Sequence, residues 1–377
     1  MKNLTANPKT LRNLSALAVM MLGLLLWIPQ GWAATIHSTA AGGDWNKAET
    51  WVGGQVPTEN DRVVVNGVVN VTGATVKEVV ISTGAILQSH GTSSDTLTVN
   101  GDITNNGIIK NADNGTRFYI KVSGNLINNG KWDNFRTTLT KGIQTITISG
   151  NPLSSRVVFY KDFSITDNSF TFAGNVNFNG HKITLPTSGK IIALKQVIGS
   201  VNIEGENTTL IFQNNSGESQ RIDSTYNVNT VILAGAGKKE VLAPTINGSV
   251  IVKKEVIIQV LGATINGSLI VEKEAILQNY GSSCWCTLTV NGDITNNGII
   301  KNGHERGYFY INVSGNILNN GIWNNYHTTL TFPSGEFRMT GTPTWEKPYR
   351  GSSYEITDYL TTQHHWQVSV DGGPWSE

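Results

Sequence analysis

Short runs of apolar residues alternate with polar residues along most of the chain. In the segment 118–122, Phe118, Ile120 and Val122 fall on one side of an extended backbone, while Tyr119 and Lys121 fall on the other. The segment 309–313 repeats this alternation. A period of two predicts half-buried β-strands.

The strands that this pattern predicts are short and rich in β-branched residues, which suit a pleated surface. The clearest are 62–65, 79–81, 143–148, 230–233 and 249–252. Helical periodicity is hard to find after position 34, and 40 glycines together with many Asn and Thr residues indicate frequent tight turns. We therefore expect an all-β fold with almost no helix.

An internal duplication is the most informative feature of the sequence. The stretch TLTVNGDITNNGIIKN occupies 96–111 and recurs unchanged at 287–302, an offset of 191 (287 − 96). The similarity continues on both sides, so that the duplicated unit covers 73–140 and 262–331. Chance does not produce so long an identity, and we infer that a unit was duplicated within the gene.

A shorter period runs inside each copy. The two Asn-Asn-Gly triplets of copy one are offset by 23 (130 − 107), and those of copy two are also offset by 23 (321 − 298). Turn residues that recur with a period of about 20 to 25 indicate the coils of a solenoid. Because Asn and Gly tolerate a left-handed backbone, we interpret the triplets as structural turns whose Asn side chains form hydrogen-bonded ladders. These turn residues are Asn105, Asn106, Gly107, Asn128, Asn129, Gly130, Asn296, Asn297, Gly298, Asn319, Asn320 and Gly321.

The predicted fold class is a right-handed parallel β-helix with about 20–25 residues per coil. The alternative is a string of tandem β-sandwich domains, which would place antiparallel strands at about every 8 to 12 positions and would give no such turn phase. The interval 149–239 fits the coil period less well, so we expect irregular coils or a protruding loop there.

Residues 1–33 have the layout of a secretory signal peptide. Lys2, Lys9 and Arg12 precede an uncharged apolar run at 14–28, and small residues stand at positions −3 and −1 of a cut before Ala34. This run is shorter than the ~20 residues that a membrane-spanning helix needs, although an uncleaved anchor is the alternative. We expect the mature chain to be secreted or displayed at the cell surface, with no membrane span.

The charge of the mature chain is close to zero. Removing the leader takes away three cations and no anions, so the net charge falls from +1 to −2, with 25 basic residues (28 − 3) against 27 acidic ones. Binding to nucleic-acid phosphates requires a basic surface, and no run of Lys and Arg is present. We therefore expect no nucleic-acid partner.

The mature N-terminus groups Trp, Gly and Pro residues in a recognisable way. Gly43-Asp44-Trp45, the stretch 50–57 and the stretch 61–65 together resemble the opening of G8-like and adhesin-type right-handed β-helix modules of bacterial secreted and surface proteins. The resemblance covers 42–88 and implies that a β-helix begins here. We expect an N-terminal cap that shields the first open strand edge, formed by Trp45, Trp51, Gly53, Gly54, Pro57 and Asp61.

These observations divide the chain into four parts. Residues 1–33 are the signal peptide, and 34–72 form the N-terminal cap and the first strands. The β-helix with its duplicated unit occupies 73–350. Residues 351–377 differ in character and are interpreted as a C-terminal cap or a fragment of an appended β-module.

Outward-facing tyrosines form the candidate ligand surface. Tyr119, Tyr308 and Tyr310 fall on the solvent side of their strands, where a flat ring can stack on a sugar. Tryptophans 132 and 323 are assigned to the core instead, because subtracting the coil offset of 23 places them over apolar core positions at 109 and 300.

Cys284 and Cys286 are the only cysteines, one residue apart in an exported chain, and form a candidate disulfide. The alternatives are an incidental loop pair or two ligands of a metal. A zinc site uses four ligands and no His or Cys partner is near in sequence, so no metal site is predicted.

The sequence indicates a scaffold more than an enzyme. Polysaccharide lyases and glycoside hydrolases also use parallel β-helices, but they need carboxylates that converge on one face, and acids are sparse here. No catalytic residue and no cofactor is predicted. We expect a non-enzymatic, structural or adhesive solenoid that contacts extracellular glycans or envelope and matrix components. The alternative is a carbohydrate-active β-helical enzyme or its fragment.

Overall fold

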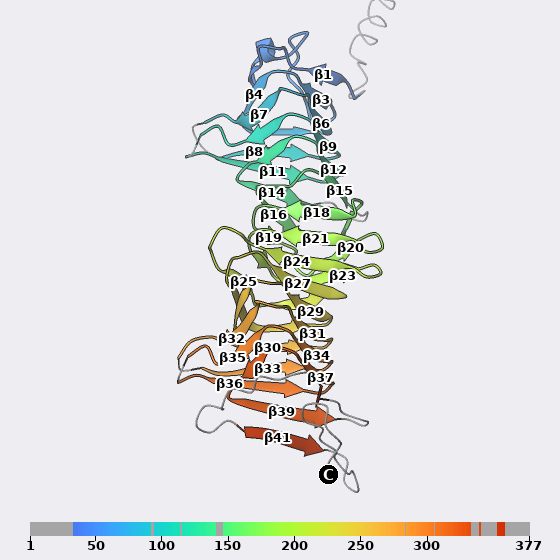
Figure 1. Ribbon diagram of the computed structural model, residues 1–377. Helices are drawn as coiled ribbons and strands as arrows, with labels where there is room; N and C mark the ends of the chain where they lie inside the picture. Colours follow the sequence, from blue (N-terminus) through green and yellow to red (C-terminus); the bar gives the residue numbers. More distant parts are fainter. Residues whose placement is uncertain are drawn as a thin grey trace, which may run out of the picture.

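The structure is a computed structural model that describes residues 33–91, 94–113, 115–140, 146–282, 284–304, 306–332, 339–340 and 353–358. The predicted signal peptide, apart from position 33, most of the predicted unit 351–377 and the first half of the predicted strand 143–148 lie outside these residues. The described chain is nearly all strand and forms a solenoid of about 12 turns. The turns stack into one elongated column with the cap at its blue end (Figure 1).

Each turn contributes strands to three stacks, which we call A, B and C, and the chain visits them in the order A, B, C. Stack A contains β1 (Thr35–His37), β3 (Arg62–Val65), β6 (Glu78–Ile81), β9 (Ile103–Asn105), β12 (Leu126–Asn128), β15 (Ile146–Gly150), β17 (Phe163–Ile165), β20 (Lys182–Thr184), β23 (Val201–Glu204), β26 (Thr225–Asn227), β33 (Trp285–Val290), β36 (Tyr308–Val313), β39 (His327–Phe332) and β41 (Ser353–Asp358).

Stack B contains β2 (Gly43–Asp44), β4 (Val68–Val71), β7 (Ile86–Ser89), β10 (Ile108–Lys110), β13 (Lys131–Asp133), β18 (Ser169–Phe172), β21 (Lys190–Ala193), β24 (Thr209–Gln213), β27 (Thr230–Ala234), β29 (Ser249–Val252), β31 (Leu269–Val271), β34 (Ile294–Asn296), β37 (Ile317–Asn319) and β40 (Met339–Thr340). Leu153 bridges β13 and the later part of this stack through parallel contacts with Trp132 and Phe172.

Stack C contains β5 (Ala74–Val76), β8 (Ser94–Val99), β11 (Arg117–Val122), β14 (Arg136–Leu139), β16 (Arg156–Phe159), β19 (Val176–Asn177), β22 (Val197–Ile198), β25 (Gln220–Ile222), β32 (Ile276–Asn279), β35 (Ile299–Lys301) and β38 (Ile322–Asn324). The long strands β28 (Lys239–Ile246) and β30 (Ile257–Ile265) pass from stack C into stack A. Gln196 joins the two runs of stack C, because its side chain bonds both Ser219 and Arg221.

Pairing between these strands is parallel throughout, and equivalent corner residues of successive coils face each other. Asn105 pairs with Asn128 in stack A, and Asn296 pairs with Asn319 in stack B. The predicted parallel β-helix is therefore confirmed. The alternative of tandem sandwiches is wrong, because sandwiches are built from antiparallel strands.

The coils vary in length more than the repeat suggests. Val63 pairs with Val79 at an offset of 16 (79 − 63), whereas Ile36 pairs with Val63 at an offset of 27 (63 − 36). Coils of unequal length still stack because the extra residues lie in the bends between strands.

The interval 149–239 continues the column, but the strand pairing of stacks B and C is interrupted there, between β13 and β18 and between β22 and β25. Ile183 pairs with Phe163 below and with Ile203 above, at the same offset of 20 on both sides (183 − 163 and 203 − 183). Elsewhere in the interval the predicted irregularity is present, since strand offsets range from 17 (163 − 146) to 25 (226 − 201). Exposed bends lie at 205–207 and 215–218.

The core runs along the inside of the column. Phe118, Ile120 and Val122 are fully buried, as the alternation predicted, and so are their repeats in β36. Trp132 pairs with Ile109 and is 1% exposed, so its assignment to the core is confirmed. Trp323 occupies the same place above Ile300.

Aromatic side chains replace aliphatic ones in the middle of the column. Phe159 and Phe163 stack with ring centroids 3.7 Å apart, and Phe178 lies 5.5 Å from Phe159 at an interplanar angle of 19°. Phe172 meets Phe159 edge-on. Large rings fill more volume per residue than Val or Ile, so shorter coils in this region enclose a packed core.

The first Asn of each triplet forms a buried ladder. The Asn105 side chain donates to the Asn128 side-chain oxygen at 2.8 Å, and its own oxygen accepts the Gly107 amide at 3.1 Å. The Asn296 side chain donates to Asn319 at 2.8 Å in the same way. The second Asn of each triplet forms an exposed ladder, in which Asn129 donates to Asn106 and Asn320 donates to Asn297, both at 2.9 Å.

The predicted reason for the glycine in these triplets is wrong. None of the twelve triplet residues has a positive φ, so a left-handed backbone is not what they supply. A Cβ on Gly130 would instead lie 2.0 Å from the Gly107 carbonyl oxygen, and a Cβ on Gly321 would lie 2.1 Å from that of Gly298. Glycine is needed because successive corners touch through their backbones.

The predicted N-terminal cap contains two buried tryptophans. Trp45 and Trp51 are 3% and 2% exposed and pack edge-on with ring centroids 4.9 Å apart. The Trp51 indole N–H donates to the Trp45 carbonyl at 2.8 Å. Gly53 and Gly54 form the bend that follows, each with positive φ, while Pro57 is buried. The cap residues thus gather beside β1 and η1 (Ala48–Thr50).

The two copies of the duplicated unit are displaced by one stack. Strand β8 lies in stack C, whereas its repeat β33 lies in stack A. Likewise β9 lies in stack A and its repeat β34 in stack B. Equivalent residues of the two copies therefore face different sides of the column.

Candidate functional site

A buried polar network holds the same corner in both copies. The Trp323 indole N–H donates to the Asn325 side-chain oxygen at 2.9 Å, and the Asn325 amide donates to the carbonyls of Phe309 and His327. The Thr328 hydroxyl donates to the same Asn325 oxygen at 3.0 Å. This network fixes the bend between β38 and β39 and so turns the next residue, Tyr326, outward beside β36.

Five aromatic side chains then meet on the outer face of stack A, and we call them the aromatic patch. Trp285 is 73% exposed and lies 5.0 Å from Tyr308 and 6.1 Å from Tyr310 by ring centroids. Tyr326 lies 4.7 Å from Tyr308 and 5.4 Å from Tyr310. His327 completes the patch at 6.0 Å from Tyr310.

The patch is flat in part, and the strands that carry it hold no Lys, Arg, Asp or Glu. The Trp285 and Tyr310 rings are inclined by 24°, so they present nearly parallel faces. The other outward positions of β33, β36 and β39 carry Thr or Asn, and His327 is the one titratable base on these three strands. Burial, with the neighbouring Tyr326 and Tyr308, raises the pKa of Tyr310, so its hydroxyl remains a donor to higher pH than an ordinary phenol.

Copy one carries a different surface at the equivalent place on stack C, which we call the arginine patch. Tyr119 and Phe135 lie 5.4 Å apart edge-on. The Arg136 guanidinium lies 4.8 Å above the Tyr119 ring, and the Arg117 guanidinium lies 5.0 Å above Phe135. The side chains at 132, 134 and 137 repeat the supporting network beneath it.

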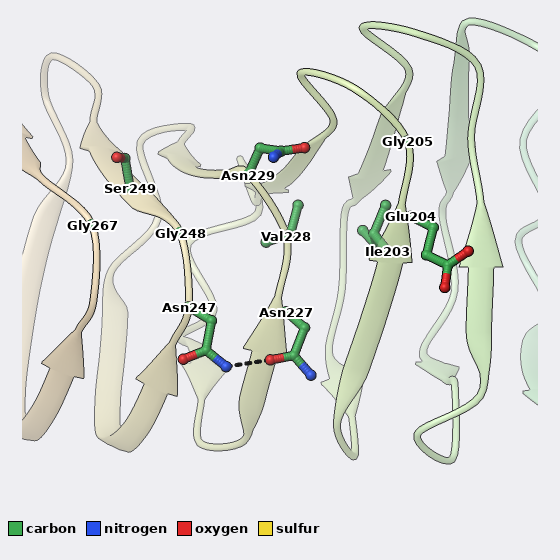
Figure 2. Close-up of a pocket in the computed structure, with 10 residues that line it drawn as sticks. All are labelled: Ile203, Glu204, Gly205, Asn227, Val228, Asn229, Asn247, Gly248, Ser249 and Gly267. Atoms are coloured by element: carbon green, nitrogen blue, oxygen red, sulfur yellow. Dashed lines mark hydrogen bonds between the residues drawn. The ribbon is translucent and has the colours of Figure 1, made fainter.

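A shallow groove at the corner between stacks A and B is a second surface feature. Asn227, Asn247, Glu204 and Ser249 line it together with backbone of neighbouring corners (Figure 2). Its carboxamides are already used by a ladder, because Asn247 donates to Asn227 and accepts from Asn266. The groove is therefore better explained as part of the column's support than as a binding site.

The cysteines lie directly beside the aromatic patch. Cys284 and Cys286 are joined as a disulfide with Cα atoms 5.2 Å apart, and Cys286 is fully buried while Trp285 between them points outward. The bridge thus holds the base of Trp285. In the described part of the chain, no three His, Cys, Asp or Glu side chains gather in a way that could hold a metal ion.

The structure brings together two of the three tyrosines proposed as a ligand surface. Tyr308 and Tyr310 share the aromatic patch, whereas Tyr119 lies on another face in the arginine patch. Sequence reasoning missed Trp285 and Tyr326. The offset of 23 between Trp285 and Tyr308 (308 − 285), which pair in register, was a signal that could have found the tryptophan.

Compared with models of protein families, with curated proteins and with solved structures, the chain matches none of them. The comparisons give no support to the G8-like or adhesin-type resemblance in particular. The structure shows a β-solenoid fold. Within its described residues, no helix is long and apolar enough to cross a membrane.

Proposed function

We propose that this protein is a non-enzymatic, exported β-solenoid that binds extracellular glycans through the aromatic patch. One observation carries the proposal: Trp285 and the three tyrosines lie side by side, partly exposed, on the outer face of a rigid sheet. Soluble proteins seldom expose clustered large rings without an interaction partner.

The chemistry of the patch fits a neutral sugar chain. The apolar face of a pyranose ring can stack on an indole or phenol ring, and the phenol hydroxyls can bond the sugar hydroxyls around it. The neighbouring Thr287 and Asn312 side chains add neutral donors and acceptors. Because the rings sit on adjacent, paired strands, the surface needs little ordering when a ligand binds.

Export is proposed on the basis of the leader and the cysteines. A positively charged start, an apolar run and small residues before Ala34 are typical of a cleaved signal peptide. A disulfide beside the patch persists in an oxidising compartment. Both features favour a scaffold that works outside the cytoplasm, where glycans are the abundant surface polymers.

Affinity electrophoresis of the full mature chain in gels that contain a neutral polysaccharide tests the proposal. A panel of β-glucan, xylan, mannan and soluble chitin oligomers is used, and reducing ends are measured in parallel. We expect retardation by at least one neutral polymer, with no release of reducing ends. Trp285→Ala and Tyr310→Ala should weaken that binding about tenfold or more, as loss of a stacking contact implies.

Tyr160→Ala is the matched control, because Tyr160 is 55% exposed and lies outside the aromatic patch. It should leave retardation unchanged. If Trp285→Ala and Tyr310→Ala bind as well as the parent chain, the patch is not the glycan site. Steady release of reducing ends would instead establish the carbohydrate-active enzyme.

A further inference from the structure

The arginine patch concentrates positive charge on one face of the column. Arg136 pairs in register with Tyr119 on one side and with Arg156 on the other, and Arg117 lies at the start of β11. Lys121 is a further outward cation of the same strand. Two arginines directly opposite each other on adjacent strands repel.

No outward acidic side chain on these strands balances this charge. The outward positions of β8, β11, β14 and β16 hold Ser, Thr, Tyr, Val and these four cations, and Asp95 of β8 points into the core. Among the described residues, none of the ion pairs includes any of the four. The face is therefore a positive surface on a chain whose net charge is otherwise close to zero.

The guanidinium groups are also held in position. Each of Arg117 and Arg136 lies over an aromatic ring, and such stacking keeps a guanidinium flat with its N–H edge free to bond. The Nε atom of Arg136 is buried and has no hydrogen-bond partner. Because this atom is closed to an approaching oxyanion, the contact expected of Arg136 is through its terminal NH2 groups.

We propose that the arginine patch is a second binding site, for the oxyanion of an acidic sugar, and that it is separate from the neutral-sugar site on stack A. This inference rests on the proposed function, since it assigns to each copy of the duplicated unit its own class of glycan. The carboxylate of a uronic acid and a sulfate ester share the chemistry that the two guanidinium groups recognise.

Duplication explains how two chemistries arose on one scaffold. At the offset of 191, Tyr308 corresponds to Arg117 (308 − 117) and His327 corresponds to Arg136 (327 − 136). The supporting Trp–Asn–Thr network is the same in both copies. The outward side chains at these positions differ while the Trp–Asn–Thr support is the same, so we infer that the specificity of the site changed on a constant support.

Isothermal titration of the full mature chain with polygalacturonate and with chondroitin sulfate, at about 50 mM and about 300 mM NaCl, tests the second site. We expect binding to at least one polymer, weakened at the higher salt concentration because the contact is ionic. The double variant Arg117→Met/Arg136→Met should lose about tenfold or more in affinity, whereas Arg136→Lys should retain only part of it because lysine lacks the planar fork. Lys190→Met, an exposed cation on stack B, is the control and should bind like the parent chain.

The two proposals fail in distinguishable ways. Trp285→Ala should remove neutral-polymer binding and leave acidic-polymer binding intact, and the arginine variants should do the reverse. Unchanged acidic-polymer affinity in Arg117→Met/Arg136→Met, with thermal unfolding like the parent's, would overturn the second site alone. Tighter binding to a single-stranded oligonucleotide than to either polymer would also overturn it, since that result assigns the patch to nucleic acid.

Discussion

At the scale of single residues, Lys239 places an amino group inside the column. The Lys239 side chain is fully buried and its Nζ donates to the Gly237 carbonyl at 3.2 Å. Burial lowers the pKa of Lys239 to about 8, because the charged form loses its hydration there. Its sequence neighbours Lys238 and Glu240 form ion pairs on the outer side instead.

A buried lysine with a lowered pKa predicts a particular pH dependence of stability. Between pH about 8 and about 10.4 the unfolded chain holds a proton that the folded chain has released, so the free energy of unfolding rises with pH in this window. Lys239→Met should remove that rise and stabilise the protein at pH 7 by about 1 to 2 kcal/mol. Urea unfolding at pH 7 and pH 10 measures both effects. A variant that is less stable than the parent at pH 7 would contradict this account.

Asp61 ties Ala34, at the start of the described chain, to the bend at Thr58. Its side chain accepts the Ala34 amide at 3.1 Å and the Thr58 amide and hydroxyl at 2.8 and 2.7 Å. Burial acts to raise the pKa of Asp61, but the bonds from Thr58 and Ala34 outweigh it and hold the pKa below its usual value. Cleavage before Ala34, as the leader predicts, would turn that amide into a charged amino group.

Asp61→Asn should destabilise the mature chain by about 1 to 3 kcal/mol at neutral pH, since one oxygen cannot accept all three bonds. The stabilisation from Asp61 is fully present above the unfolded pKa of about 3.9 and is lost as the pH falls through the lower folded value. The variant should therefore lose less stability than the parent between about pH 4 and about pH 2, as thermal melts at the two values would show. Equal acid sensitivity of both chains would argue against this role.

At the scale of the strand and its corner, the sequence analysis gave the wrong reason for glycine in the Asn-Asn-Gly triplets. The actual reason is that successive coils approach each other closely there. Asn-Asn-Gly triplets look like left-handed turns, because those residues tolerate positive φ, but the backbone there is not left-handed. What requires glycine is the Gly107 carbonyl beneath Gly130. The sequence period locates such a corner, but it does not give the distance between the backbones of equivalent corners in successive coils.

Gly130→Ala should destabilise the fold by about 2 to 4 kcal/mol, because its Cβ would meet backbone that cannot move without separating two coils. Gly115→Ala is the matched control, since its Cβ would stay 3.6 Å from the nearest atom, the Asp113 side chain. Chemical denaturation of both variants against the parent measures the difference. Similar stabilities for the two variants would mean that the corners do not touch.

The sequence predicted the elements of the repeats well and those between them poorly. Subtracting 23 placed Trp132 over Ile109 correctly, because a coil of constant length keeps its register. The middle of the column lacks Asn-Asn-Gly triplets, relies on Phe159, Phe163 and their neighbours, and has strand offsets from 17 (163 − 146) to 25 (226 − 201), so its coils left no periodic signal. A period is visible in the sequence only where the bends repeat the same residues.

At the scale of the whole molecule, the length of chain between the two copies decides which way each patch faces. Because coil offsets range from 16 (79 − 63) to 27 (63 − 36), the offset of 191 does not reveal that copy two is displaced by one stack. The sequence therefore did not predict that Tyr119 and Tyr310 lie on different faces. It also did not predict that Tyr326 lies beside Tyr308 and Tyr310. A column with two patches on different faces is suited to bridging two polymers.

Both patches depend on coils that stack with their strands paired in register. Cross-linking of cysteines placed at paired positions tests this register directly. Thr104 pairs with Ile127 in copy one, and Thr295 pairs with Leu318 in copy two. The double variants Thr104→Cys/Ile127→Cys and Thr295→Cys/Leu318→Cys should each form a new disulfide on mild oxidation, mapped by mass spectrometry of peptides. Thr104→Cys/Thr295→Cys, which joins equivalent positions of different copies, should form none within the monomer. Efficient bridging of that last pair, with no bridging of the first two, would contradict the stacking.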